Sequence, residues 1–144
     1  MVNLKNGVKV GELGGWIEKE ENLSHIGDAW ISDNACVTDN AHVAGDAHVA
    51  DNACVSGDTW VSGNAHVTGN AWVSKIADLL QITGLGTAHR TTTVYRTKNG
   101  IEITCGCFCG NLEQFREQVV KTREGKVRDE YLKFAELIEI YFRL

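Results

Sequence analysis

Between Gly27 and Ser74 a β-branched residue recurs at every sixth position, and a small residue stands two positions before each of them. Side chains two residues apart point to the same side of a strand, so this pattern predicts short strands that bury both residues of each pair. A helix is excluded, because six is not a helical period and glycine followed by Asp or Asn recurs too often. The predicted inward residues are Ile31, Val37, Val43, Val49, Val55, Val61, Val67 and Val73, together with Ala29, Ala35, Ala41, Ala47, Ala53, Thr59, Ala65 and Ala71.

Each six-residue unit begins with turn-forming residues, since Gly or Asp comes first and Asp or Asn follows. These residues tolerate the left-handed backbone that a sharp corner requires. Each unit is therefore predicted to be a very short strand with a corner. Self-similarity at a fixed period indicates a solenoid with atypical terminal units.

The repeat resembles the hexapeptide repeat of left-handed parallel β-helices, in which three six-residue units form one triangular coil. The resemblance implies slightly fewer than three coils, stacked about 4.8 Å apart as neighbouring strands are. Residues three units apart would then superpose. We expect one corner to carry an amide ladder and another a column of glycines, formed respectively by Asn34, Asn52 and Asn70 and by Gly27, Gly45 and Gly63.

The residue just before each Val or Ile must point outward, and stacking arranges these residues in three columns. Faces that carry Trp and His without Lys, Arg or Glu are unusual on a solvent-exposed surface. We therefore expect at least one face to be buried against identical subunits, and the resemblance implies a homotrimer. The columns are Trp30, His48 and His66; Cys36, Cys54 and Trp72; and His42 and Trp60.

Residues 1–25 depart from the repeat, and we interpret them as a cap or an imperfect first turn. Their apolar anchors are Leu4, Val8, Val10, Leu13, Trp16 and Ile17. We assign residues 1–77 to a β-helix domain with this cap, whose clean repeats cover residues 27–74, and residues 78–144 to a second domain. The predicted fold class is mainly β: a left-handed parallel β-helix followed by a small α+β domain.

The second domain is predicted to contain a β-hairpin and two helices. Residues 75–88 are an apolar transition in which the repeat is lost, and residues 91–108 predict the hairpin, with its turn at Asn99-Gly100. A helix begins after Asn111, whose N-cap signature is completed by Gln114, and Gly125 is its predicted C-cap. Its apolar face consists of Leu112, Phe115, Val119 and Val120.

A second helix is predicted from about Arg128 to Phe142. Its apolar set is too wide for a simple surface helix. We expect it to pack against both the hairpin and a further surface, such as a neighbouring subunit.

Three segments together resemble a family of small bacteriophage and prophage proteins. They are LGGWIEKEENLS at residues 13–24, the repeat itself, and TTTVYRT…CGCF…NLEQF near the end of the chain. The resemblance implies a role in phage–host interaction, in the cytoplasm of the infected cell, and no enzymatic activity.

Charge is divided unevenly along the chain, whose net charge is −5. Residues 1–77 hold four Lys and ten acids, whereas residues 78–144 hold ten basic residues, including all six Arg, and nine acids. The overall acidity disfavours nucleic-acid binding, which needs phosphate neutralisation, but a compact anion could bind to the second half. No apolar run predicts a membrane span or a secretory leader, and the odd count of five Cys indicates reduced thiols in a cytoplasm.

The segment between Gly84 and Thr93 is the strongest candidate ligand site. It combines glycines, which free backbone N–H groups for an anion, with an Arg fork and a run of hydroxyl groups. It lacks the Gly-Lys-Ser/Thr end of a Walker loop, and a plain polar connection into a strand is the alternative. The predicted ligand-binding residues are His89, Arg90, Thr91, Thr92, Thr93 and Arg96.

Two other groups of residues could carry chemistry. His48 and His66, one coil apart on one face, could bind zinc between subunits, but no acidic residue stands beside them on the face, so interface packing is favoured. Hexapeptide-repeat acyltransferases use a catalytic histidine and coenzyme A, which makes that activity the alternative function. For an acyltransferase, the candidate catalytic histidines are His42, His48 and His66. Cys105-Gly106-Cys107-Phe108-Cys109 lacks a structural zinc spacing, and we expect buried thiols beneath the helices.

We therefore predict a non-enzymatic homotrimer that binds a small anionic ligand in pockets between subunits and requires neither a metal nor a cofactor. Given the phage resemblance, the expected ligand is a nucleotide immune signal, sequestered to counter host defence. The alternatives are an acetyl-coenzyme A-dependent acyltransferase and a protein-binding or virion-associated module.

Overall fold

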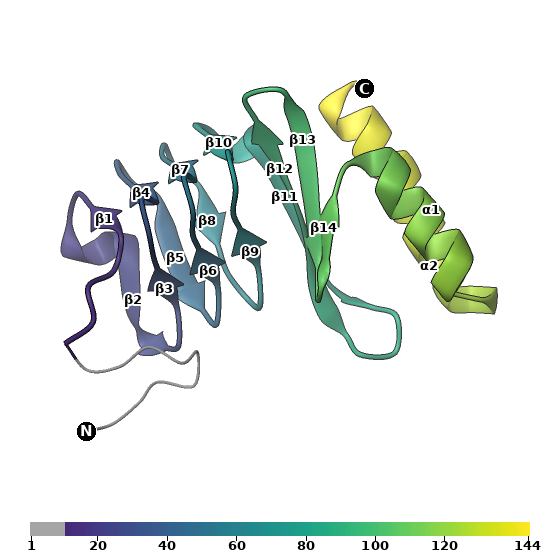
Figure 1. Cartoon of the computed structure of the whole chain (residues 1–144), viewed down its shortest axis with the longest axis horizontal. Helices are drawn as coiled ribbons and strands as arrows, with labels where there is room; N and C mark the ends of the chain where they lie inside the picture. Colours follow the sequence, from purple (N-terminus) through teal and green to yellow (C-terminus); the bar gives the residue numbers. More distant parts are fainter. Residues whose placement is uncertain (1–10) are drawn as a thin grey trace.

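The computed structural model describes residues 11–144, so the predicted anchors Leu4, Val8 and Val10 lie outside the described residues. Along the long axis of the molecule, a parallel β-helix is followed by a four-stranded antiparallel sheet and then by two helices (Figure 1). This arrangement confirms the predicted β-helix and the small α+β domain after it. None of the helices in the described residues is long and apolar enough to cross a membrane.

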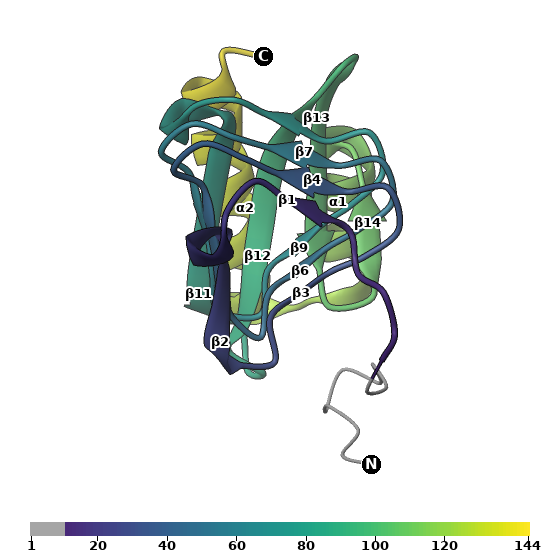
Figure 2. The same cartoon turned by 90° about the vertical axis from the view of Figure 1, so that its left-hand side faces the viewer.

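Three parallel sheets form the sides of the β-helix, in the orders β1-β4-β7-β10, β2-β5-β8 and β3-β6-β9 (Figure 2). Trp30 pairs with His48 and His48 with His66, so residues three units apart superpose as predicted. The strands are β1 Trp16–Ile17, β2 Leu23–Gly27, β3 Trp30–Ile31, β4 Cys36–Val37, β5 His42–Gly45, β6 His48–Val49, β7 Cys54–Val55, β8 Trp60–Val61, β9 His66–Val67 and β10 Trp72–Val73. Short 3₁₀ turns at Glu20–Asn22 and Ile76–Asp78 interrupt the coils.

The first coil is an imperfect copy of the others. Trp16 pairs with Cys36, and Gly27 pairs with Gly45, with an irregularity in β2 between Leu23 and Gly27. The interpretation of this region as an imperfect first turn is therefore confirmed for its described part.

The corners have the left-handed backbone that the sequence predicts. Residues opening the units have φ between 56° and 90°, including Asp33 and Asp51. The Asp51 carboxylate accepts the Gly69 N–H at 3.0 Å, so the corner side chain also bonds the next coil. Asn34 donates to Asn52 at 3.4 Å, which confirms that part of the predicted amide ladder.

The predicted inward residues fill the β-helix core. Every Val and Ile of the repeat is at most 2 % exposed, and the paired small residues are also buried. Thr59 stands where the other units have alanine, and its buried hydroxyl donates a hydrogen bond to the carbonyl of Ser56.

The antiparallel sheet differs from the prediction in three places. Its strands are β11 Leu79–Leu85, β12 Arg90–Thr97, β13 Gly100–Cys105 and β14 Phe108–Gly110. The expected apolar transition thus contains a full strand, β11. The hairpin turn lies at Lys98-Asn99, because Thr97 pairs with Gly100, one residue before the predicted position. The strand also ends at Cys105, so the cysteine run does not continue along one strand.

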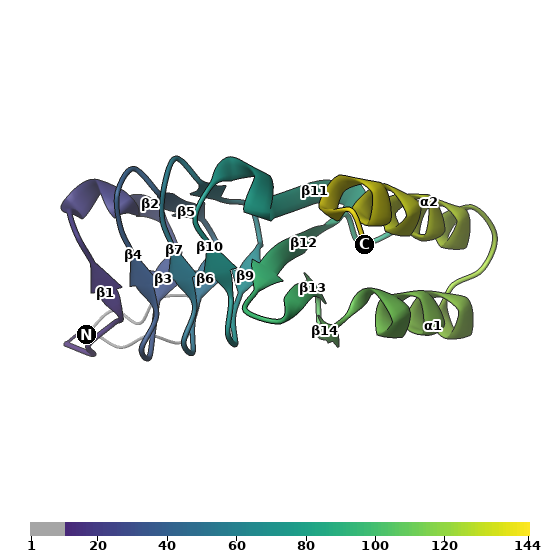
Figure 3. The same ribbon diagram turned by 90° about the horizontal axis from the view of Figure 1, so that it is seen from above.

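Two helices, α1 (Leu112–Thr122) and α2 (Gly125–Phe142), cover one face of this sheet (Figure 3). The predicted capping box between Asn111 and Gln114 is present. Val120 is 55 % exposed and so lies off the buried face of α1. Gly125 begins α2 and does not cap α1, whose C-cap is Arg123.

The other face of the sheet closes the end of the β-helix. Along β12, Thr91 and Tyr95 face the last coil, where they accept the backbone N–H groups of Asn64 and Thr68. Thr104 of β13 donates to the carbonyl of His66. Tyr95 belongs to the β-helix core, whereas its neighbour Val94 belongs to the core beneath the helices. The sheet is therefore the C-terminal cap that a solenoid requires.

Candidate anion-binding site

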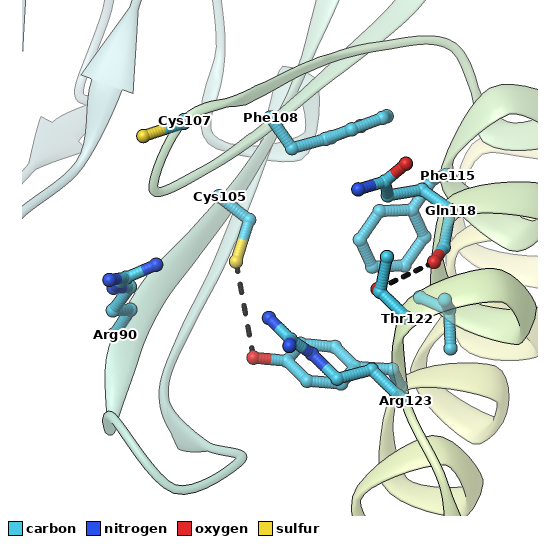
Figure 4. A pocket seen from close by; sticks show the side chains of 10 residues that line it. Arg90, Cys105, Cys107, Phe108, Phe115, Gln118, Thr122 and Arg123 are labelled. Atoms are coloured by element: carbon cyan, nitrogen blue, oxygen red, sulfur yellow. Dashed lines mark hydrogen bonds between the residues drawn. The ribbon is translucent and has the colours of Figure 1, made fainter.

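A cavity of about 140 Å³ lies where the start of β12, the turn between β13 and β14, and both helices meet (Figure 4). A smaller cavity of about 50 Å³ has four lining residues in common with the first cavity: Arg90, Cys105, Arg123 and Tyr131. These residues come from β12, the end of β13, the segment between the helices, and α2. The site is therefore assembled by the packing of the helices on the sheet.

Arg90 is held against the turn that follows β13. A Cβ atom placed on Gly106 would lie 2.5 Å from Nη1 of Arg90, and the φ of Gly106 is 58°. Glycine at this position therefore provides both the left-handed turn and the space for the guanidinium group. In Figure 4, Arg90 and Arg123 approach the cavity from opposite walls.

Neither of these two arginines forms an ion pair with another residue in 11–144. By contrast, Arg96 pairs with Asp78 and Arg116 with Glu139. A guanidinium group presents a fork of donors that fits carboxylate and phosphate oxygens. Two such groups without an acidic partner at one cavity make an anion the ligand that best matches its electrostatics.

Tyr131 and Cys105 form the polar floor of the cavity. The Tyr131 hydroxyl donates to the carbonyl of Leu85 at 3.4 Å and lies 4.0 Å from Cys105 Sγ. Burial raises the pKa of Tyr131, with a further contribution from Cys105, while Arg123 opposes the shift. The tyrosine therefore remains a neutral hydrogen-bonding group at physiological pH.

An aromatic wall faces the charged residues. The ring centroids of Phe108 and Phe115 are 5.5 Å apart, and those of Phe115 and Tyr131 are 6.0 Å apart. Phe115 is buried, whereas Phe108 is partly exposed at the cavity. The site thus combines cationic groups with a planar apolar surface.

The structure separates the residues that the sequence predicted to bind a ligand together. Arg90 lines the cavity, and His89 is exposed beside it, with Nδ1 3.1 Å from the carbonyl of Gly84. Thr91, Thr92 and Thr93 are buried in β12. None of their hydroxyl groups lines the cavity. The Thr91 hydroxyl accepts the Asn64 N–H, and the Thr92 hydroxyl donates to Cys105 Sγ. The Thr93 hydroxyl is enclosed without a hydrogen-bond partner among the described residues.

Arg96 performs a different task from the predicted one. Its Nε lies 3.4 Å from the buried Asp78 carboxylate, and Nη2 donates to the carbonyl of Phe142 at 3.2 Å. The guanidinium also lies 5.2 Å from the centre of the Phe142 ring. These contacts join the last coil, the sheet and the end of α2.

The predicted interface residues occupy the outward columns of the β-helix. Trp60 is 60 % and Trp72 52 % exposed, and Trp16 extends the Cys36–Cys54–Trp72 column with 71 % exposure. Trp30, His42 and His48 are half-buried, and His66 is exposed.

The array histidines make local contacts along their columns. His42 packs against Trp60 with ring centroids 4.6 Å apart, and its Nδ1 contacts the carbonyl of Glu21. The His48 ring lies 5.9 Å from that of His66, and its Nε2 is 3.3 Å from Ser32 Oγ. Burial lowers the pKa of His48, and the neighbouring His66 lowers it further.

The expectation that the three clustered cysteines are buried is wrong for two of them. Cys107 lies in the turn and Cys109 in β14, and both are exposed, because the chain reverses after Cys105. Cys109 donates to the Glu102 carboxylate, and burial together with this acid raises its pKa to about 11. Across the part of the chain that the structure describes, no group of three His, Cys, Asp or Glu side chains could hold a metal ion.

The sequence pattern did not single out Arg123, Phe108 or Tyr131 as site residues. Arg123 stands in the charged segment between the two helices, where its sequence neighbours carry no signal of a site. Only the packing of α1 and α2 on the sheet brings these residues to Arg90.

Comparisons with protein-family models, with curated proteins and with solved structures gave no match.

Proposed function

We propose that this protein binds a small anionic ligand, without chemical conversion, in the cavity between Arg90 and Arg123. The observation that carries the proposal is the pair of guanidinium groups that approach one cavity and have no acidic partner within the described residues. Binding an anion supplies the countercharge that the fold itself does not.

The favoured ligand is a nucleotide. Its phosphate would lie between the two guanidinium groups, and its base would stack against the apolar surface at Phe108. A second hollow of about 380 Å³ also includes Arg123, and it is lined by Lys121, Arg128 and the acidic Glu124. The two hollows share Arg123 and Thr122, so a ligand larger than a single phosphate would extend from one hollow into the other.

The phage resemblance supplies the biological context of the proposal. A phage protein that holds a nucleotide without converting it would lower the free concentration of a host immune signal. Sequestration of this kind needs tight binding and high copy number, and it needs no catalytic group.

We propose a homotrimer as the assembly that carries the sites. Trp60 and Trp72 stand exposed on different sides of the β-helix, in columns whose outward residues carry no charge. Exposed aromatic residues favour burial against another protein surface, and at Trp72 the Lys98 ammonium lies 5.7 Å from the centre of the ring. A rigid β-helix would then present three copies of the anion site.

Isothermal titration calorimetry against a panel of mono-, di- and cyclic nucleotides tests the ligand proposal. At least one nucleotide is expected to bind the parent protein, and Arg90→Ala and Arg123→Ala are each expected to weaken its binding at least about tenfold, which corresponds to about 1.4 kcal/mol. Arg116→Ala is the matched control, because Arg116 already pairs with Glu139 outside the cavity. Equal affinities of all three variants would contradict the proposal.

A further inference from the structure

We propose that Cys107 is a modification site at which low-molecular-weight disulfides bearing carboxylates, such as oxidised glutathione, form a mixed disulfide that blocks the anion site. The blocking effect rests on the proposed function, whereas the modification itself depends only on the geometry around the thiol.

Cys107 is exposed and lines the same cavity as Arg90 and Arg123. It follows Gly106 in the turn between β13 and β14, against which the Arg90 guanidinium packs. Figure 4 shows Cys107 at the edge of the site, on the side where Arg90 enters. An incoming disulfide can therefore place a carboxylate on a guanidinium while its sulfur atoms reach the thiol.

The other cysteines have less favourable surroundings. Cys109 donates to Glu102, which raises its pKa to about 11, and the nearby acid repels a carboxylate-bearing reagent. Burial and the neighbouring Cys54 raise the pKa of Cys36. Cys105 is half-buried behind the turn, where its sulfur accepts the Thr92 hydroxyl. Cys54 is half-buried in β7 of the β-helix. Since the thiolate is the attacking species and access limits its reaction, Cys107 is the favoured site.

The reaction is a thiol–disulfide exchange. The Cys107 thiolate attacks one sulfur of the reagent, a new S–S bond forms, and the original S–S bond breaks. The electron pair of that bond leaves with the second glutathione as a thiolate, which takes a proton from water. Arg90 and Arg123 stabilise the carboxylates of the reagent and the negative charge shared by the sulfur atoms during exchange.

The product would close the site. A glutathionyl group on Cys107 places its carboxylates on the guanidinium groups and fills a cavity of only about 140 Å³. Reduction by free thiols would reopen it. Ligand capture would therefore follow the redox state of the cell.

The modification is tested by exposing the full-length protein to oxidised glutathione and locating adducts by peptide mass mapping over time. Cys107 is expected to be modified first, and Arg90→Ala with Arg123→Ala is expected to slow its modification at least about fivefold, as loss of charge-assisted contacts would. The uncharged reagent hydroxyethyl disulfide should react with parent and double variant at similar rates. First modification of another cysteine, or equal slowing with both reagents, would overturn the proposal.

Nucleotide titration before and after glutathionylation tests the blocking effect separately. The modified parent is expected to lose affinity, and Cys107→Ser is expected to bind equally well before and after the same treatment. Undiminished affinity of the modified parent would overturn the blocking claim. If Cys107 reacts as described but no nucleotide binds the untreated parent, the proposed function fails and the modification site stands.

Discussion

Arg90 and Arg96 show how two arginines on one strand acquire opposite roles. Both belong to β12, and alternation directs both toward the helix side of the sheet. Arg96 finds the buried Asp78 carboxylate and the carboxyl end of α2, whereas Arg90 extends over Gly106 into an open cavity. The surroundings of each side chain decide whether it supports the fold or is available to a ligand.

Arg96→Ala should destabilise the protein without changing ligand affinity. It would leave the buried Asp78 carboxylate without its cation, which costs about 1–3 kcal/mol, although Asp78 keeps its bonds to Ser74. Chemical denaturation measures the loss. Arg116→Ala, which breaks an exposed pair, is the control and should cost less than about 1 kcal/mol. Equal costs for the two variants would refute a structural role for Arg96.

His48 should make the free energy of unfolding depend on pH. Burial and His66 lower its pKa in the folded state below the ordinary value of 6.5. As the pH falls through 6.5, the unfolded chain therefore binds a proton that the folded chain resists, so the free energy of unfolding decreases. Denaturation of the parent and His48→Gln at pH 7.5 and at pH 5.5 measures this term. The variant should lose less stability, and parallel losses would exclude His48 as the source.

At the scale of the element, the corner determines how closely the coils stack. Gly57 and Gly69 both have left-handed backbone, with φ of 70° and 64°. A Cβ on Gly57 would overlap the carbonyl oxygen of Ser74, whereas the nearest atom to a Cβ on Gly69 is Glu102 Oε2 at 3.4 Å. The two glycines therefore share a backbone requirement and differ in the space around them.

Alanine at these two corners should separate the two effects. Both substitutions carry the backbone cost of about 1 kcal/mol. Gly57→Ala should cost about 1–3 kcal/mol more, because the backbone of the next coil must shift. Thermal unfolding of the two variants gives the difference. Midpoints that agree within error would show that close coil contact at Gly57 does not limit stability.

The repeat was predictable from the sequence because its period, its corner residues and its inward pairs all require the same backbone. The strand β11 was not, since Leu79–Leu85 mixes apolar residues with Gln81, Thr83 and Gly84 and becomes a strand by pairing with β12. Arg90 could be singled out as an anion-binding candidate, but the exclusion of Thr91–Thr93 could not. Thr91 is buried where the sheet meets the last coil, whereas Thr92 is buried on the opposite face beside Cys105.

At the scale of the whole molecule, one sheet serves two cores. Tyr95 closes the β-helix, where its hydroxyl accepts the Thr68 N–H, and burial raises its pKa to about 12. On the opposite face, Val94 and Ile103 support the helices that line the candidate anion site. The β-helix and the candidate site are therefore coupled through a shared wall.

The assembly proposal predicts a species of about three times the chain mass of 15.8 kDa by size-exclusion chromatography with light scattering. Trp60→Glu and Trp72→Glu place a charge on two different sides of the β-helix. The variant whose new glutamate lies in the subunit interface should dissociate into monomers, because an unpaired charge is costly to bury. The other variant should remain a trimer. A parent protein that elutes as a monomer would contradict the trimer.

The central claim is that Arg90 and Arg123 together create an anion site. Calorimetric titration of the strongest-binding nucleotide into the parent, Arg90→Ala, Arg123→Ala, the double variant and Arg116→Ala tests it most directly. We predict saturable binding by the parent and Arg116→Ala, at least about tenfold weaker binding by each single variant, and no measurable binding by the double variant. Binding by the double variant with the affinity of the parent would contradict the account.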